Sequence, residues 1–521
     1  MKKWTLLIQI LLLIAVLLFM VVAASPKQTI VQPPQDIEEL WAIEDTRSPS
    51  EGPLVTYLEN NGVPAAYSAQ DNTFYCTLGL EQGDEWPEIR LCVPDADGVS
   101  LCFSDDYTYD WCQEAIAEGY SYEIMAYTET HYDYFYVVFT GLPIVSLQTT
   151  GVISEAETAA RVSISAYGEA PVVVNASAHV RGAGSSISEK KSYHVDFVRG
   201  YGRGSVLVDM PMMGVVDDII LQAGVMDSTL MRDKLSWALY ADIVPDTESY
   251  GARRVEYVEV FINDEYAGVY LMMEPVDDAQ ELAKEGRSLA HTDSVYRSTQ
   301  LLYGVMDRPY VENTVRENSA YELHYGGMAN SFVMLKPYLE LETMEDDAEF
   351  GNAAMERIDL ESMLAYYLFI QAGGMTDNVY NNMYIHAHQT ADGIRYRFAP
   401  WDMDLTWGRG KDEATGEFYD GLYNFGIAQR MIDLDAGGCT CDMLMSLWRD
   451  MRAGAFTEAN VQMLIDRYTH ELNASGAYAR NAMRWRLEGA SADGYEIVAF
   501  SGQHFETLDK LFAEMCEGNV E

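Results

Sequence analysis

Basic residues are scarce in this sequence. The 521-residue chain has 34 Lys and Arg against 81 Asp and Glu, which gives a formal net charge of −47 at pH 7. A surface this negative repels nucleic-acid phosphates and anionic lipid headgroups. The composition therefore excludes nucleic acid as a partner and allows a membrane only through an N-terminal anchor. It also makes a bound nucleotide costly unless metal ions and a few basic side chains offset the repulsion locally.

Signatures of hydrolases are missing as well. The sequence has no G-x-S-x-G, no H-E-x-x-H and no Ser, His and Asp spacing typical of a catalytic triad, so nothing favours a hydrolase. Apolar residues are not lacking: they make up 48% of the chain, with 12% aromatics, which excludes global disorder. The length suits two to four domains, or one large catalytic domain with an appendage.

A long apolar run opens the chain. It follows Lys2 and Lys3, extends from Thr5 to Ala24, and ends in small residues, so residues 1–25 read as an export segment. The run is longer than the roughly 7–15 residues of a cleaved signal and close to the ~20 that span a bilayer. A cleaved signal peptide and a retained membrane anchor are both consistent with it. Either one predicts an extracytoplasmic protein, secreted or anchored to the outer face of the cell membrane.

Seven cysteines fit an oxidising compartment. Four of them lie in one early region and could close two disulfides, with a pairing that the sequence does not give: Cys76, Cys92, Cys102 and Cys112. Cys439 and Cys441 form a C-x-C motif without a second Cys or His pair nearby. They could pair with each other, with Cys516, or not at all.

Composition and periodicity divide the rest of the chain. Residues 26–52 mix Pro, Gln and acids without periodicity and predict a linker. Residues 53–147 alternate short apolar runs with turn clusters, which predicts a β-rich accessory module. Residues 148–500 combine strands, a clear hairpin at 255–274 and a set of C-terminal helices, and we predict one large domain there. Residues 501–521 are expected to be a tail.

The chemistry concentrates between Asp377 and Gly408. Asp377 is followed five residues later by Asn382, the spacing of a protein-kinase catalytic loop, in which the Asp accepts the proton of the substrate hydroxyl and the Asn holds a metal ion. After a predicted hairpin come Asp402 and Asp404, which add oxygen ligands suited to Mg²⁺ or Mn²⁺. Acids that only cap turns on a solvated hairpin are the alternative. The bulky apolar residues interleaved with these acids, such as Trp401, argue against it.

A second kinase-like feature is the strand that ends at Met273 and Glu274. It continues through a Pro-restricted segment to Val276, as the strand before a kinase hinge does. Such a hinge would read an adenine edge through its backbone. A plain sheet strand followed by a turn fits this segment about equally well.

A predicted phosphate-binding site is the third kinase-like feature. We predict it from Arg181, the hydroxyls of Ser185 and Ser186, and a lysine from the Lys190–Lys191 pair. Lys191 is favoured because it shares a strand face with Tyr193 and would point into a cleft. On the next helix, which is expected to start near Ser228, Arg232 adds positive charge and Asp233 is the only acid able to pair with a lysine.

Five motifs, in order, resemble the CotH (spore coat protein H) family of secreted atypical protein kinases: VRGAGSSISEKKSYHVDF, DSTLMRDKLSWALYADI, EVFINDEYAGVYLMMEPVDD, TDNVYNNMYIH and FAPWDMDLTWG. The resemblance implies an α+β, kinase-like bilobal domain that uses ATP and a divalent metal to phosphorylate Ser or Thr of partner proteins. Asp377 would match the catalytic Asp. Asp402 and Asp404 would match the metal-binding W-D-x-D, and Lys190–Lys191 the basic pair before the strand.

Two functions are therefore weighed. The first is an exported protein kinase that transfers the γ-phosphate of ATP to Ser or Thr of extracytoplasmic or cell-surface proteins. The second is a non-catalytic adhesion or scaffold module with the same fold. The export segment, the separate β module and the scarcity of ATP outside cells support this second function. The metal-suited acids beside a hinge-like strand favour the kinase.

Overall fold

The structure is a computed structural model of mixed α+β type, in agreement with the predicted α+β class. It describes residues 28–32, 36–80, 89–94, 96–104, 113–182, 187–200, 204–244, 251–276, 294–299, 321–325, 333–379, 381–409, 421–487 and 492–517. The predicted export segment, Ser185, Ser186 and Cys112 lie outside these ranges. Within them, no helix combines the length and apolar character needed to cross a bilayer.

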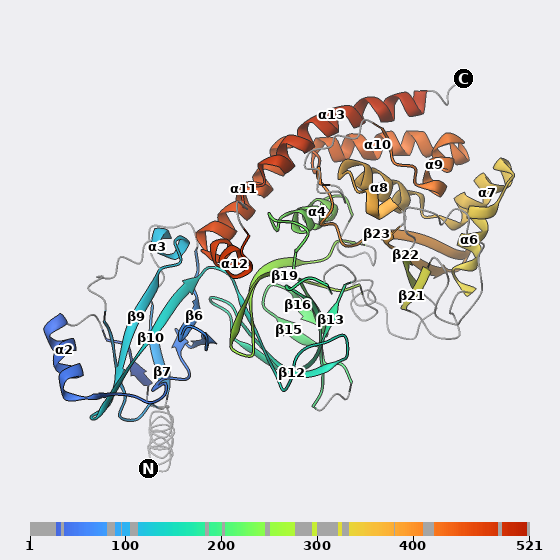
Figure 1. Ribbon diagram of the computed structural model, residues 1–521. Coiled ribbons are helices and arrows are strands. Elements are labelled where there is room, and N and C mark those ends of the chain that lie inside the picture. Colours follow the sequence, from blue (N-terminus) through green and yellow to red (C-terminus); the bar gives the residue numbers. More distant parts are fainter. Residues whose placement is uncertain are drawn as a thin grey trace, which may run out of the picture.

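The first part of the chain forms a β module, which lies at one end of the molecule (Figure 1). One of its sheets has the strand order β1 (Gln28–Ile30), β7 (Leu91–Pro94), β3 (Glu59–Asn60), β4 (Val63–Pro64). The other has the order β5 (Ala66–Ser68), β6 (Thr73–Thr77), β10 (His131–Thr140), β9 (Ser121–Tyr127), β8 (Ser100–Phe103), with β2 (Ser48–Pro49) beside β10. Helices α2 (Ile37–Thr46) and α3 (Gln113–Ala117) complete the module.

The predicted linker at 26–52 is wrong where the structure describes it. Strand β1 pairs with β7, β2 pairs with β10, and α2 buries Leu40 against Cys102 and Met125. A few apolar residues at strand and helix positions were enough to dock this Pro-rich segment, although it shows little periodicity. The β module therefore begins before residue 53.

The early cysteines that the structure describes form no disulfide. Cys76, Cys92 and Cys102 are free thiols. Their side chains diverge: Cys76 lies in the main core of the β module, Cys102 packs with Leu40 in a separate cluster, and Cys92 contacts Glu59 of the neighbouring strand. Proximity in the sequence did not bring the sulfur atoms together.

A seven-stranded closed barrel follows the β module (Figure 1). Its strands, in order around the barrel, are β11 (Ile144–Thr149), β12 (Thr158–Ser165), β13 (Val172–Arg181), β14 (Ser192–Phe197), β17 (Asp218–Gln222), β19 (Glu265–Met273) and β18 (Val255–Ile262). A separate ribbon pairs β15 (Val208–Met210) with β16 (Gly214–Val216). Because β11 belongs to the barrel, the predicted boundary after residue 147 is too late by one strand.

The predicted hairpin is confirmed as β18–β19. Its turn places Asn263 and Asp264 at φ +50° and +62°, a left-handed pair that favours a tight two-residue connection. On the buried side of β14, Tyr193, Val195 and Phe197 fill the barrel interior. The alternate residues of β14 therefore face outward, as the period of two requires.

The remaining elements build a helical part that covers one side of another four-stranded sheet (Figure 1). The sheet has the order β21 (Tyr321–Tyr325), β20 (Ser294–Thr299), β22 (Asn381–Thr390), β23 (Gly393–Pro400). The helices are α4 (Arg232–Ala241), α6 (Lys336–Thr343), α7 (Asp347–Arg357), α8 (Leu360–Ala372), α9 (Gly426–Asp433), α10 (Thr440–Ala453), α11 (Glu458–Ala474), α12 (Ala477–Trp485) and α13 (Tyr495–Glu517), with short turns η2 (Thr376–Val379) and η3 (Ala436–Gly438).

The predicted tail at 501–521 is wrong. Helix α13 continues through residue 500 to Glu517 and buries Phe505, Leu508 and Phe512 in the main core. Apolar residues recur at helical spacing up to Phe512, so the domain boundary proposed at 500 divides one helix. The start of α4 also differs from the prediction, because Ser228 lies in a turn before it and the first helical residue is Arg232.

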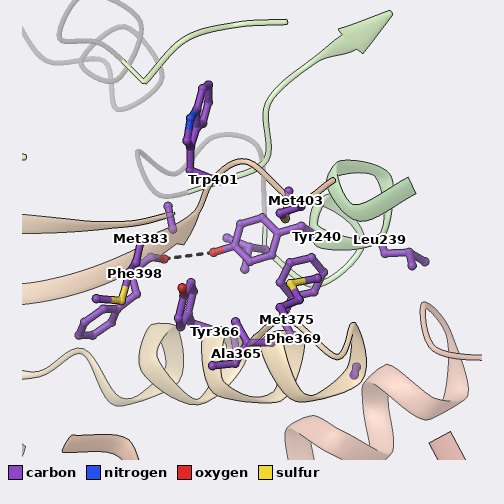
Figure 2. Close-up of a cluster of buried hydrophobic side chains, with 14 of the residues drawn as sticks. Leu239, Tyr240, Ala365, Tyr366, Phe369, Met375, Met383, Phe398, Trp401 and Met403 are labelled. Atoms are coloured by element: carbon purple, nitrogen blue, oxygen red, sulfur yellow. Dashed lines mark hydrogen bonds between the residues drawn. The ribbon is translucent and has the colours of Figure 1, made fainter. Parts of the chain in front are cut away.

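A buried aromatic cluster fixes the position of α4 on the helical part (Figure 2). The hydroxyl of Tyr240 donates to the carbonyl of Phe398 on β23 at 3.1 Å, and its ring packs on Phe369 of α8. Met403, which follows β23, lies in the same cluster. The segment that carries Asp402 and Asp404 is thereby held between α4 and α8.

Candidate active site

A cleft of about 800 Å³ lies between the outer face of the barrel and the β20–β22–β23 sheet. Much of its lining is polar, with Pro275 and Val276 of the segment after β19 as apolar members. The polar residues are Arg181, Ser192, His194, Asp218 and Gln222 from the barrel, and Arg297, Asp377, Asn382, Tyr384, Asp402 and Asp404 from the helical part. Predicted residues far apart in the sequence thus meet in one cavity: Arg181, Val276, Asp377, Asn382, Asp402 and Asp404.

Asp377 is buried in η2, at the end of α8. Its Oδ2 atom accepts hydrogen bonds from Nδ2 of Asn382 at 2.9 Å and from Nδ2 of Asn381 at 3.3 Å. With the amide nitrogen of Asn382 directed to the carboxylate, its Oδ1 atom points the other way, toward Arg297 at 3.5 Å. The spacing of five residues therefore produces a direct contact, and the Asn382 oxygen, which accepts a hydrogen bond from Arg297, keeps a second lone pair for a ligand.

Asp402 is fixed from the opposite wall. Gln222 donates from Nε2 to Asp402 Oδ1 at 3.1 Å, and the Gln222 oxygen accepts from Arg181 at 3.0 Å. Both Asn382 and Asp402 have left-handed backbone, at φ +48° and +54°. Two such residues in one cleft store backbone strain at the site, which is typical of functional positions.

The acids of the cleft destabilise one another as anions. Burial raises the pKa of Asp402 above its usual range, although Arg181 and Arg297 oppose this effect. Burial and the nearby charge of Asp402 raise the pKa of Asp404 well above its usual range. Because the surroundings disfavour both carboxylates as anions, a bound cation would be stabilised here.

Helix α4 holds the segment that carries these acids. Asp233 accepts a hydrogen bond from the backbone N–H of Met403 at 3.3 Å, and Ser236 accepts one from the Trp407 ring nitrogen at 2.8 Å. The Nε of Arg232 donates to the Thr406 carbonyl at 2.9 Å. Asp233 therefore positions the Trp401–Trp407 loop. It was predicted as the only possible acidic partner of a lysine, but it accepts a hydrogen bond from the backbone of Met403 instead.

The raised pKa of Asp233 predicts that the free energy of unfolding depends on pH. Burial, followed by the charge of Asp402, raises its pKa from 3.8 to about 7. Between those values the folded chain binds more protons than the unfolded chain, so the contribution of this group to stability is present below pH 4 and is lost as pH rises toward 7. Asp233→Asn keeps an acceptor for Met403. It is expected to raise the free energy of unfolding at pH 8 by up to about 4 kcal/mol and to change it little below pH 4.

Unfolding in EDTA at both pH values measures this. Asp242→Asn, at the exposed other end of α4, is the matched control and should give the same small change at both. A pH-independent effect of Asp233→Asn would contradict the assigned electrostatics.

Two arginines supply the positive charge of the cleft. Arg181 lies over the Trp401 ring at 5.3 Å, and the charges of Arg181 and Arg297 both act on Asp402. Sequence reasoning missed Arg297, because it stands on β20 in a stretch without a recognisable motif. It also missed Gln222, whose amide becomes informative only when β17 faces Asp402.

The lysine pair does not reach this cleft. The ammonium of Lys190 is buried under α12, where it donates to the Val269 carbonyl and to Asn481 Oδ1 and lies 4.6 Å from the Tyr270 ring. Lys191 is not among the cleft-lining residues. The face that it was predicted to share with Tyr193 is the barrel interior, whereas Ser192 and His194 face the cleft. The predicted lysine contact with phosphate is therefore corrected for both positions.

Lys190 is expected to matter for stability and not for nucleotide binding. Lys190→Met keeps the apolar stem but removes the donor to Val269 and Asn481, which should lower the free energy of unfolding by about 1–3 kcal/mol. Urea unfolding measures this loss, with the exposed Lys510→Met as control. If Lys190→Met were no longer stabilised against heat by ATP and metal, this result would contradict the correction and indicate that Lys190 contacts the nucleotide.

Three other residues predicted to bind the nucleotide, Arg232, Met273 and Glu274, do not line the cleft. Arg232 is buried and forms ion pairs with Asp227 at 2.6 Å and with Glu496, so its guanidinium joins α4 to neighbouring segments and does not line the cleft. Of the three residues predicted to form the hinge, Met273, Glu274 and Val276, Val276 lines the cleft, beside Pro275. Met273 pairs within the barrel, and Glu274 is buried beside Arg254.

The oxygen donors fit a small divalent cation. Asp402, Asp404 and the Asn382 oxygen are hard ligands of the kind that Mg²⁺ and Mn²⁺ prefer. Burial is the main cause that raises the pKa values of the two acids, so a bound cation would offset the cost of burying their anions. Arg181 and Arg297 suit the phosphates that such a cation accompanies. The residues present therefore fit a metal–nucleotide pair.

Fold and site together define an α+β protein with an acid-lined cleft between a β barrel and a helical part. The CotH kinase protein family model matches residues 178–499, more than half of the chain, and the chain belongs to that family. This confirms the resemblance drawn from the five motifs. No curated protein matches the chain. Every cleft residue named above lies inside the matched range, and the β module lies outside it.

Proposed function

We propose that the chain is an exported protein kinase of the CotH type. It transfers the γ-phosphate of ATP to Ser or Thr of extracytoplasmic or cell-surface proteins. The observation that carries this proposal is the convergence of Asp377–Asn382 and Asp402–Asp404 with Arg181 in one cleft. The barrel and the helical part would be the two lobes of a kinase-like fold, with Val276 at the connection.

Asp377 would act on the substrate. Its carboxylate, oriented by the amides of Asn381 and Asn382, accepts the proton of the attacking hydroxyl and aligns that oxygen. Burial of Asp377 at 8% exposure excludes most bulk water from this step. Proton acceptance and alignment of this kind contribute roughly 10²–10⁴-fold to a rate.

Asp402, Asp404 and Asn382 would hold the divalent cation, and Arg181 and Arg297 would face the phosphates. Mg²⁺ or Mn²⁺ with ATP supplies the transferable phosphoryl group and neutralises the charge that develops on its oxygens. Gln222 would keep Asp402 in place through its hydrogen bond. With a net charge of −47, two arginines in the cleft give ATP a local positive field that the rest of the surface denies it.

The cellular setting is also proposed. The apolar run from Thr5 to Ala24 supports export, either secreted or anchored by this segment. The acceptor is a protein with an exposed Ser or Thr. The β module packs against the barrel through Tyr75, Phe261 and Tyr266, and it could present such a partner to the cleft.

Transfer of labelled phosphate tests the proposal. The full chain, incubated with [γ-³²P]ATP, Mg²⁺ or Mn²⁺ and casein as a generic acceptor, should yield labelled phosphoserine or phosphothreonine on casein or on the chain itself. Equal incorporation of labelled phosphate by the wild type and by Asp402→Ala would contradict the proposed kinase activity.

A non-catalytic surface module is the second candidate. It is favoured by one observation: among the described residues that line the cleft there is no lysine, and Lys190 is committed to α12. This candidate predicts no thermal stabilisation by ATP with Mg²⁺. Ligand binding at a hundredfold excess over Kd stabilises by about 2.7 kcal/mol, so a measurable shift that Asp402→Ala abolishes would exclude it as the whole function.

A further inference from the structure

A second group of metal-ligating side chains lies on the barrel wall of the cleft, away from Asp402. It consists of His194 and Asp196 on β14 and Asp218 on β17. Residues i and i+2 of a strand share a face, so His194 and Asp196 point the same way. Asp218 is the direct cross-strand partner of Asp196 in the antiparallel register.

This arrangement leaves negative charge to be balanced. Like charges directly opposite each other on neighbouring strands are destabilising. His194 lies between the two acids: its Nε2 is 2.6 Å from Asp218 Oδ2 and 3.7 Å from Asp196 Oδ1. One nitrogen and two carboxylate oxygens from these three residues all lie within 4.8 Å of one another. A divalent cation in place of the proton shared by His194 and Asp218 would neutralise both acids.

A neighbouring histidine adds to the site. The ring of His179 on β13 is centred 5.2 Å from the His194 ring, and its Nδ1 is buried without a hydrogen-bond partner among the described residues. Burial, followed by the nearby His194, lowers the pKa of His179, which disfavours its charged form. A neutral imidazole nitrogen beside a His–Asp–Asp group is a suitable additional ligand.

The group is separate from the proposed phosphotransfer centre. Gln222, which contacts Asp402, stands four residues after Asp218 on the same strand, or about 13 Å along it. The paired metals of a two-metal phosphoryl site lie only ~3.5–4 Å apart. By this spacing along β17, the His–Asp–Asp group lies outside the paired-metal distance from the Gln222 position. His194 and Asp218 line the cleft, so an ion held there would be accessible from it.

We propose that His194, Asp196 and Asp218 bind a divalent transition-metal ion of the Zn²⁺ class at a second site in the cleft. The mixed nitrogen and carboxylate donors select such an ion over Mg²⁺, which prefers oxygen alone. The proposal does not rest on kinase activity, because the site needs neither ATP nor Asp402.

Calorimetric titration of the full chain with ZnCl₂, in the absence of nucleotide, tests this. The wild type and Asp402→Asn should both show a tight Zn²⁺ site that MgCl₂ does not displace. His194→Gln and Asp196→Asn should each weaken it at least tenfold. The Asp196 side chain is 40% exposed, so its replacement should leave the fold intact even where His194→Gln does not.

Asp209→Asn, an exposed acid on β15, is the matched control and should bind Zn²⁺ like the wild type. Absence of a tight site in the wild type, or unchanged affinity in both His194→Gln and Asp196→Asn, would overturn the proposal. Loss of the site in Asp402→Asn would assign the bound metal to the phosphotransfer centre. Failure of phosphate transfer, by contrast, would leave the Zn²⁺ result unaffected.

Discussion

Asp402→Asn is expected to lose phosphate transfer by roughly a thousandfold and, with it, the thermal stabilisation by ATP and Mg²⁺. A bound metal ion contributes several kcal/mol to stabilising transition-state charge, and losing about 4 kcal/mol of this corresponds to three orders of magnitude in rate. Asparagine keeps the hydrogen bond from Gln222, so the cleft keeps its shape while one anionic ligand is removed. Initial rates of ³²P transfer and thermal shifts measure the two losses.

The free protein should respond in the opposite direction. Because burial raises the pKa of Asp402, its anion is disfavoured in the folded chain, and removing the charge should stabilise the metal-free protein at neutral pH. Reduced activity with unchanged or increased stability therefore separates loss of the metal from loss of the fold. Asp392→Asn, in the exposed two-residue turn of the same hairpin, is the control and should retain both activity and the thermal shift. Wild-type transfer by Asp402→Asn would contradict the assignment.

Asp377→Asn is expected to lose transfer by about 10²–10⁴-fold while ATP–Mg²⁺ still stabilises the protein. This residue is assigned to the hydroxyl of the acceptor and not to the nucleotide, so the loss should fall on kcat. Its side chain accepts from Asn381 and Asn382, and an asparagine can still accept through its oxygen. Steady-state kinetics, together with the thermal shift, separate the two effects.

Asn381→Ala provides the matched comparison, since it removes the longer of the two hydrogen bonds to Asp377 and keeps the carboxylate. A loss of no more than about tenfold is expected, because Asn382 still orients the acid. If Asp377→Asn abolished the ATP–Mg²⁺ shift as fully as Asp402→Asn does, the division of roles between the two acids would be wrong.

The part of the site that local spacing determines could be predicted from the sequence. Asp377 and Asn382 are five residues apart, and a tight turn before β22 is enough to bring them into contact. Asp402 follows a two-stranded hairpin whose alternating pattern is plain, so its return to Asp377 needs only that hairpin to form. The β18–β19 hairpin was predictable for the same local reason.

The part of the site that depends on packing between distant elements could not be predicted from the sequence. Lys190 and Lys191 both precede a strand with clear alternation, but alternation does not say which face becomes the inside of a closed barrel. Helix α12, almost 300 residues later in the chain, buries the Lys190 ammonium through Asn481. Arg297 gave no signal because a single arginine on a short strand resembles any surface residue. Helix α13 is different: its apolar residues recur at helical spacing on both sides of residue 500, so the sequence contains the signal for it.

A crystal of the chain grown with Mn²⁺ and a non-hydrolysable ATP analogue would test the central claim most directly, through the anomalous signal of the metal. The account predicts an Mn²⁺ peak bonded to carboxylate oxygens of Asp402 and Asp404 and to the triphosphate, with Arg181 or Arg297 at phosphate oxygens and Asp377 facing the γ-phosphate. A nucleotide bound outside this cleft, or one bound in it with no metal at Asp402 or Asp404, would contradict it.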